Sequence, residues 1–143
     1  KSVKGHLGKL IISPTINQRD WERIYFLGRV PYEHFISILQ ISTIHVYLTY
    51  PFVLSWSLLE AMSAGCTIVA SDTPPVKEIV KQNENGRLVD FFDHNQLAGE
   101  ICYLLENECE ARRLSKSARG HAIDNYDLEK ICLPQQIKWV EAL

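Results

Sequence analysis

The chain has 143 residues, a formal net charge of −2 and a pI near 6.2, so it lacks the strongly basic character that is typical of nucleic-acid-binding domains. Its 46% hydrophobic and 22% charged residues are ordinary for a globular protein. No stretch reaches the ~18 consecutive apolar residues that a transmembrane helix needs. We therefore expect one domain over residues 1–143, no transmembrane segment and no nucleic-acid partner.

The N-terminal residues and the cysteines indicate in which cellular compartment the protein is expected. The first residues are polar and resemble no secretory signal, and the chain does not begin with Met, so we interpret it as a fragment of a longer protein. No two cysteines have the C-x-x-C spacing of metal or redox sites. We expect four free thiols in a cytoplasmic protein: Cys66, Cys102, Cys109 and Cys132.

Predicted strands and helices alternate along the chain. Short apolar runs predict strands at residues 24–27, 44–49, 67–71 and 87–91. Helical periodicity predicts helices at 31–40, 53–64, 96–105 and 108–119, and a last helical segment from 128 to 143 that Pro134 interrupts. A helix that opens at Pro74 or Pro75 carries Val76, Ile79 and Val80 inward. This alternation predicts an α/β fold with a parallel sheet.

Several single residues mark the joints between these elements. Gly65 stands where a helix needs a left-handed residue after its last turn. Residues 83–86 have turn composition. Asp72 or Thr73 can cap the helix that follows, and we interpret Asp72 as an N-cap rather than a phospho-acceptor, because the strand ends near residues 27 and 49 carry no acidic partners. His45 lies inside an apolar strand, and we expect a packed core histidine.

The loop from Tyr50 to Phe52 leads directly from a strand into a helix. The first N–H groups of a helix lack partners within it and carry positive potential, so this end of the helix suits a phosphate group. Ligands of open parallel sheets bind at the carboxyl ends of the strands, which is where this loop lies. In the alternative interpretation, Ser55 and water satisfy the same donors.

One carboxylate, Glu60, lies in the middle of the otherwise apolar helix predicted from residue 53. Buried carboxylates normally have a partner. At 1.5 Å per residue Glu60 lies ~10 Å from the predicted helix start, on a face lined by small side chains, which suits a nucleoside diphosphate with its ribose. The alternative is an ion pair with an arginine such as Arg29.

Six blocks of sequence resemble the C-terminal domain of GT-B glycosyltransferases, in particular the retaining enzymes of glycosyl transferases group 1. In order, the blocks are residues 23–30, 42–49, 58–65, 68–71, 78–80 and 85–89. The resemblance implies a Rossmann-like doubly wound parallel sheet that holds the nucleotide half of a sugar donor. It covers roughly Arg23 to Leu105.

The resemblance also implies roles for residues at matching positions. Glu60 matches the second Glu of the family's Glu-x7-Glu motif, which binds the donor ribose. Phe52, Val53 and Leu54 match the loop that meets the pyrophosphate and the sugar. Gly28, Arg29 and Val30 match the loop beside the nucleobase.

This chain departs from the family pattern at the first Glu of the motif, where it has Phe52. The basic residues that neutralise the pyrophosphate in the family have no convincing match in residues 1–20, so we expect them, and an acceptor-binding N-terminal domain, to precede the fragment. The predicted strand ends carry no paired acids, so we expect no metal ion and no other cofactor.

The sequence therefore predicts the donor-binding domain of a glycosyltransferase that moves a hexose from a nucleoside-diphosphate sugar to an acceptor hydroxyl with retention. The acceptor, a sugar or a lipid, would be bound through the missing domain, and we expect the fragment alone to be inactive. One alternative is a degenerate, non-catalytic binding module, suggested by Phe52. Another is an unrelated doubly wound signalling domain, against which residues 58–62 argue.

Overall fold

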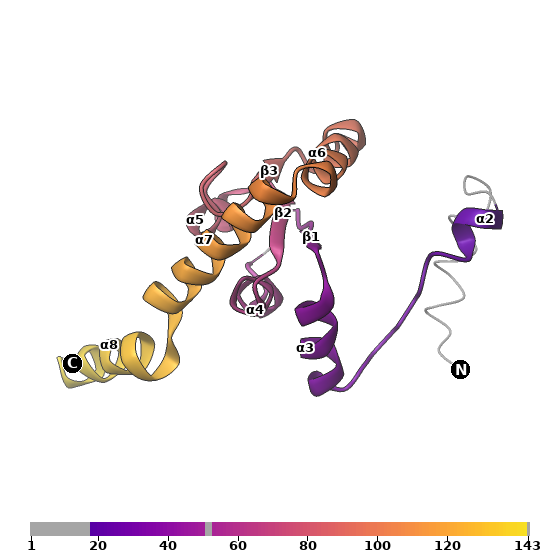
Figure 1. Ribbon diagram of the computed structural model, residues 1–143. Helices are drawn as coiled ribbons and strands as arrows, with labels where there is room; N and C mark the ends of the chain where they lie inside the picture. The colour runs from indigo at the N-terminus through magenta and orange to yellow at the C-terminus, as the bar shows by residue number, and fades with distance from the viewer. Residues whose placement is uncertain (1–17, 51–52, 143) are drawn as a thin grey trace. The chain divides into compact units, whose positions relative to one another are not determined.

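The computed structural model describes residues 18–50 and 53–142 (Figure 1). The chain divides into two compact units, residues 1–35 and 36–143, and each is described by itself.

In the first unit a short helix, α2 (Gln18–Trp21), is followed by an irregular segment, and α3 (Tyr32–Ile41) begins near the unit's end. Residues 24–27 form no strand, and their four apolar side chains are 36–78% exposed. The strand predicted there is therefore wrong. An apolar run becomes a strand only by hydrogen bonding to a neighbour, and no described strand pairs with this one. Pro31 precedes α3, as the sequence predicted.

The second unit is built on a three-stranded parallel sheet of order β1-β2-β3. Its strands are β1 (Ile44–Tyr47), β2 (Thr67–Ser71) and β3 (Arg87–Val89), and helices α4 (Trp56–Ala64) and α5 (Pro74–Ile79) make the two crossovers. All five residues of the central strand β2 are buried, because it has a strand on either side and helices above its faces. The sequence predicted β2 with its full bounds, and the parallel α/β architecture is confirmed.

One face of the sheet packs on α6 (His94–Glu106) and the start of α7 (Glu108–Tyr126). Side chains alternate between the two faces of a strand. Those on this face meet helical residues in one cluster, made of Val69, Val89, Leu104, Ala111 and Leu114 with half-buried Ile44, Leu97 and Ile101. Thr67 anchors α7 by donating its hydroxyl to the Ala111 carbonyl at 3.0 Å.

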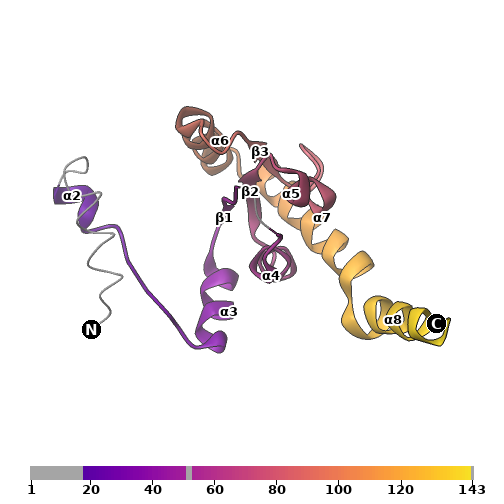
Figure 2. The ribbon, with the colours of Figure 1, turned by 180° about the vertical axis from the view of Figure 1, so that it is seen from behind.

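Helix α4 packs against α7 through its apolar face (Figures 1 and 2). Leu58, Ala61 and Met62 are fully buried there. Arg119 of α7 donates to the Ser63 carbonyl at 2.7 Å. Gly65 ends α4 in the left-handed conformation with φ +88°, as predicted.

The turn between α5 and β3 is held by the side chain of Asn85, which is 2% exposed. Its Oδ1 accepts the Lys81 N–H at 2.7 Å, and its Nδ2 donates to the Ile79 carbonyl at 3.0 Å. Val76, Ile79 and Val80 point inward beside it, as predicted. These bonds position β3, and with it the loop that follows β3.

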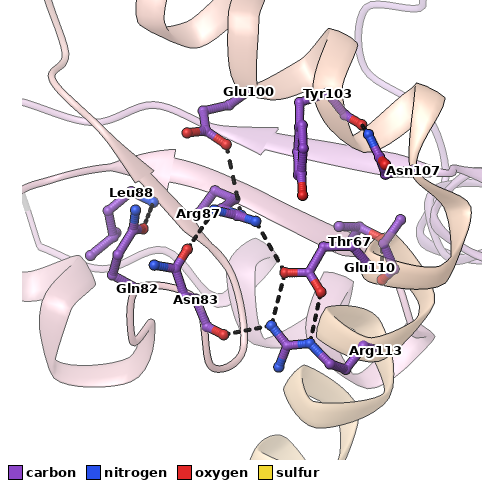
Figure 3. A network of polar contacts seen from close by, with 11 residues as sticks. Thr67, Gln82, Asn83, Arg87, Leu88, Glu100, Tyr103, Asn107, Glu110 and Arg113 are labelled. Atoms are coloured by element: carbon purple, nitrogen blue, oxygen red, sulfur yellow. Dashed lines mark hydrogen bonds and ion pairs between the residues drawn. The ribbon is translucent and has the colours of Figure 1, made fainter.

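Arg87 fastens β3 to both following helices (Figure 3). Its guanidinium lies 3.0 Å from the Glu110 carboxylate of α7, 3.7 Å from Glu100 of α6, and above the Tyr103 ring. Arg113 donates to the same Glu110, and this hydrogen bond, with the charges of Arg113 and Arg87, lowers the pKa of Glu110. These ion pairs therefore hold β3 against α6 and α7, and their role is structural.

The C-terminal segment continues from α7 as a π-helical turn, η1 (Leu128–Cys132), and α8 (Leu133–Glu141). The predicted interruption at Pro134 is wrong, since this proline lies in the first turn of α8, where its missing N–H needs no partner. No side chain of α8 is buried. Among the described residues, no helix is both long and apolar enough to cross a membrane.

Candidate functional site

Helix α4 begins three residues later than the sequence predicted. Ser55 has extended backbone angles, φ −86° and ψ 144°, and occupies the N-cap, so the first helical residue is Trp56 rather than Val53. The Ser55 N–H is held by the buried Tyr47, whose hydroxyl accepts it at 2.8 Å. The end of β1 therefore fixes where the helix starts, which apolar periodicity does not reveal.

The N-cap residue of α4 makes only a weak hydrogen bond to the backbone N–H groups at the start of the helix. The Ser55 hydroxyl accepts the Ser57 N–H at 3.4 Å, which is long for a hydrogen bond. Ser57 also donates its own hydroxyl to Ser55 at 3.1 Å. Val53 and Leu54, the predicted loop residues that the structure describes, directly precede this cap, and Val53 is 70% exposed. Phe52 lies outside the described residues.

Glu60 lies four residues after Trp56, so it is only ~6 Å from the start of α4 along the helix axis. It is half-buried, with Ser57 and Ala64 on the same side of the helix, while Leu58, Ala61 and Met62 form the buried side. This division into two faces is the one that the sequence predicted. Within the described residues of its own unit, 36–50 and 53–142, Glu60 makes no hydrogen bond or ion pair, and the predicted alternative partner, Arg29, belongs to the other unit.

Gly28, Arg29 and Val30 belong to the other compact unit. Gly28 adopts φ +64°, which favours glycine, and Arg29 is exposed. The structure thus describes a sharp turn at the predicted nucleobase loop. The three residues remain a prediction for the site.

The carboxyl ends of β1 and β2 are joined by a fully buried serine that the sequence analysis did not single out. The Ser71 hydroxyl donates to the Thr49 carbonyl at 2.9 Å and accepts the Thr49 N–H at 3.0 Å. It therefore holds the start of the β1 loop beside the end of β2. In the sequence, the signal for this role of Ser71 was that a polar residue ends an otherwise apolar strand.

The prediction that Asp72 caps α5 is wrong. Thr73 holds the N-cap position, and its hydroxyl makes no capping hydrogen bond. Asp72 instead forms an ion pair with Lys77 at 2.8 Å. Because the two prolines of the first turn, Pro74 and Pro75, carry no N–H, a cap at this helix start has fewer donors to satisfy.

His45 is half-buried in β1, and its buried Nε2 has no hydrogen-bond partner among the described residues. Burial lowers its pKa, so the ring is neutral at physiological pH. This agrees with the predicted core histidine. Cys66 is also buried, and burial raises the pKa of its thiol, which donates to the Leu39 carbonyl.

Residues 15–121 match the family described as glycosyl transferases group 1. The chain belongs to this family. An uncharacterized glycosyltransferase of Methanocaldococcus jannaschii is 32% identical over 108 residues, which are 75% of this chain and 28% of that protein. The chain thus spans less than a third of the length of that relative.

Solved structures agree with the assignment to the group 1 family. Sucrose-phosphate synthase from Thermosynechococcus elongatus superposes with a TM-score of 0.73 at 26% identity, over 85% of this chain and 30% of that one. Anabaena HepE, crystallised in complex with UDP-glucose, gives a TM-score of 0.84 at 20% identity, over 99% of this chain and 38% of that one. The second likeness concerns the fold alone.

Proposed function

We propose that this chain is the donor-binding part of a glycosyltransferase and holds the nucleoside diphosphate of a sugar donor. The observation that carries the proposal is Glu60, a half-buried carboxylate without a partner among the described residues, one turn inside a helix that starts at the carboxyl edge of a parallel sheet. In such sheets this edge is the usual ligand site. Membership of the group 1 family and the UDP-glucose bound by Anabaena HepE support the same conclusion.

In this proposal each part of the donor has a partner in the chain. The N–H groups at the start of α4 face the diphosphate, since the helix dipole favours a negative charge there. Glu60 accepts hydrogen bonds from the two ribose hydroxyls. Val53 and Leu54, with Phe52, contribute the loop beside the diphosphate and sugar, and Gly28, Arg29 and Val30 the loop beside the base.

The complete protein, in this proposal, transfers a hexose to a sugar or lipid acceptor with retention of configuration in the cytoplasm. The protein's part in the reaction is electrostatic stabilisation of the leaving diphosphate by fixed donors. Phe52 stands where the family has its first motif Glu, which favours a second candidate, a binding module without transfer activity. Donor cleavage by the full-length protein distinguishes the two.

The test is the replacement Glu60→Gln, with binding of UDP, GDP and ADP measured by calorimetry. Loss of the charge-assisted hydrogen bonds to the ribose is expected to weaken binding by about 1.5–3 kcal/mol while the fold is retained. The matched control is Glu106→Gln, which changes an exposed glutamate at the end of α6 and should leave affinity unchanged.

Two outcomes contradict the proposal. One is the absence of binding heat with all three nucleotides at millimolar concentration. The other is a Glu60→Leu variant that unfolds without any selective effect on affinity, because a residue kept for a ligand costs little stability when it is replaced by an apolar side chain of similar size.

A further inference from the structure

Three aromatic side chains meet beside the proposed donor site, and the function proposed above does not use them. Tyr50 follows β1, and Phe91 and Phe92 follow β3. The Tyr50 ring centroid lies 5.4 Å from that of Phe91 and 5.0 Å from that of Phe92, and the two phenylalanines are 5.0 Å apart. We call these three residues the aromatic cluster.

The aromatic cluster lies across the carboxyl edge of the sheet. Strand β2 lies between β1 and β3, so side chains that join the loops after β1 and β3 must pass the end of β2. The first residue after β2 is Asp72, whose N–H donates to the Val89 carbonyl of β3 at 2.7 Å. The cluster therefore belongs to the edge where parallel sheets bind their ligands.

The cluster is well fixed and yet largely open to solvent. Tyr50 is 58% exposed and Phe92 is 64% exposed, whereas Phe91 is half-buried. Phe92 meets both other rings edge to face, and the exposed fractions of Tyr50 and Phe92 show that much of the surface of these two side chains stays open to solvent. A hydrogen bond within the loop after β3 also fixes Phe92, because the Asp90 carboxylate accepts the Phe92 N–H at 2.8 Å.

The chemistry around the cluster suits a sugar ring. An aromatic face carries negative partial charge and attracts the slightly positive C–H groups on the flat side of a pyranose. The neighbouring Asp72 and Asp90 are exposed carboxylates, and besides the bonds that they make to Lys77 and to the Phe92 N–H they have further lone pairs that accept hydrogen bonds from hydroxyl groups. An aromatic surface with a few polar groups at its border is typical of small-molecule sites.

We propose that Tyr50 and Phe92 form a stacking surface for a pyranose ring of the substrate. This inference rests on the proposed function, because it places the surface beside the diphosphate end of the same donor site. The ring is either the sugar of the donor or a sugar of the acceptor. Both have the same stacking chemistry, and the experiment separates them.

The experiment compares the chain with its Tyr50→Ala and Phe92→Ala variants. Calorimetry measures affinity for UDP, GDP and ADP and for their hexose conjugates, and saturation-transfer NMR measures binding of methyl hexosides. Tyr50→Phe keeps the ring and should behave as the unchanged chain. Trp139→Ala, which removes an exposed aromatic from α8, is the matched control. Circular dichroism checks that each variant is folded.

We expect both alanine variants to lose about two- to tenfold in affinity for a sugar-containing ligand, the range of a single aromatic contact, with no change in affinity for the free nucleotides. A loss for the nucleotide sugars assigns the surface to the donor sugar. A loss of the methyl hexoside signals alone assigns it to the acceptor.

Two further outcomes separate this inference from the proposed function. If the nucleotides bind and neither alanine variant affects any sugar ligand, the stacking surface is refuted and the donor site stands. If no nucleotide binds but the methyl hexoside signals depend on Tyr50 and Phe92, the stacking surface stands and the nucleotide site is refuted.

Discussion

Gly86 joins the turn after α5 to strand β3, and the space for a side chain at this position is taken by its neighbours. A Cβ added there would lie 2.7 Å from Val80 Cγ1, 3.2 Å from the Ile68 carbonyl oxygen and 3.3 Å from Ile68 Cβ. Both neighbours are fully buried and belong to elements that cannot move independently. The absence of a side chain at Gly86 is therefore a packing requirement.

We expect Gly86→Ala to destabilise the chain by about 1–3 kcal/mol, as overpacking of a filled core does. Urea unfolding followed by circular dichroism measures the change. Gly99→Ala is the matched control, because Gly99 lies inside α6 with nothing within 4 Å of an added Cβ. Alanine there should stabilise the helix by about 0.5–1 kcal/mol. Equal effects of the two substitutions would contradict the packing argument.

At the same scale, the sequence singles out one side chain of the proposed site, Glu60. Glu60 is conspicuous in the sequence because it interrupts an apolar helical stripe, and the structure places it on the half-buried side, without a partner among the described residues. Tyr50, Phe91 and Phe92 gave no comparable signal. Their meeting depends on the sheet topology, because β1 and β3 lie parallel on either side of β2 and their carboxyl ends therefore bring residues 41 and 42 positions apart to the same edge.

The elements were predicted best where burial alone determines the pattern. Strand β2 is an apolar, β-branched run with all residues buried, and its two ends were predicted correctly. Helix α7 extends to Tyr126, seven residues beyond the prediction, because Ala118 and Ala122 continue the buried stripe of Ala111 and Leu114. Small residues such as alanine give a weak hydrophobic signal, so the end of this helix was missed.

Boundaries set by tertiary contacts could not be predicted in this way. Ser55 caps α4 because Tyr47 holds its N–H, and Pro134 is accepted because a π-helical turn precedes it. Residues 24–27 have the composition of a strand, yet hydrogen bonding to a neighbour defines a strand. In each case the deciding partner lies elsewhere in the chain or in the backbone geometry of the preceding turn.

Helix α8 should contribute little to the stability of the second compact unit. None of its side chains is buried, and Trp139 is 68% exposed. We expect the free energy of unfolding of a variant that ends at Cys132 to lie within about 0.5 kcal/mol of that of the complete chain, since changes away from buried contacts have small effects on stability. Urea unfolding measures this difference.

The control for this truncation is Leu114→Ala. Leu114 is fully buried in the cluster between α7 and the sheet, so its truncation should cost about 2–5 kcal/mol. A loss of stability on removing α8 as large as that of Leu114→Ala would show that the helix packs on the domain after all.

At the scale of the whole molecule, the proposed donor site lies at the carboxyl edge of the three-stranded parallel sheet, in a chain that matches 28% of the length of the Methanocaldococcus relative. The three aspartates that follow β2 and β3 on this edge already have partners within the chain. Asp72 pairs with Lys77, Asp90 accepts the Phe92 N–H, and Asp93 accepts the Gln96 N–H at 2.9 Å. A magnesium ion would need one or two carboxylates from the protein in addition to the phosphate oxygens.

We therefore expect the full-length protein to neutralise the leaving diphosphate with helix N–H groups and basic side chains, without a divalent metal. The prediction is that release of nucleoside diphosphate from the sugar donor continues at an unchanged rate in EDTA. The Asp72→Asn variant, assayed with and without EDTA, is the control, because it removes an exposed candidate ligand but leaves the amide donors of α4 in place. Complete loss of activity in EDTA, restored by magnesium or manganese and abolished by Asp72→Asn, would refute metal independence and make Asp72 a ligand.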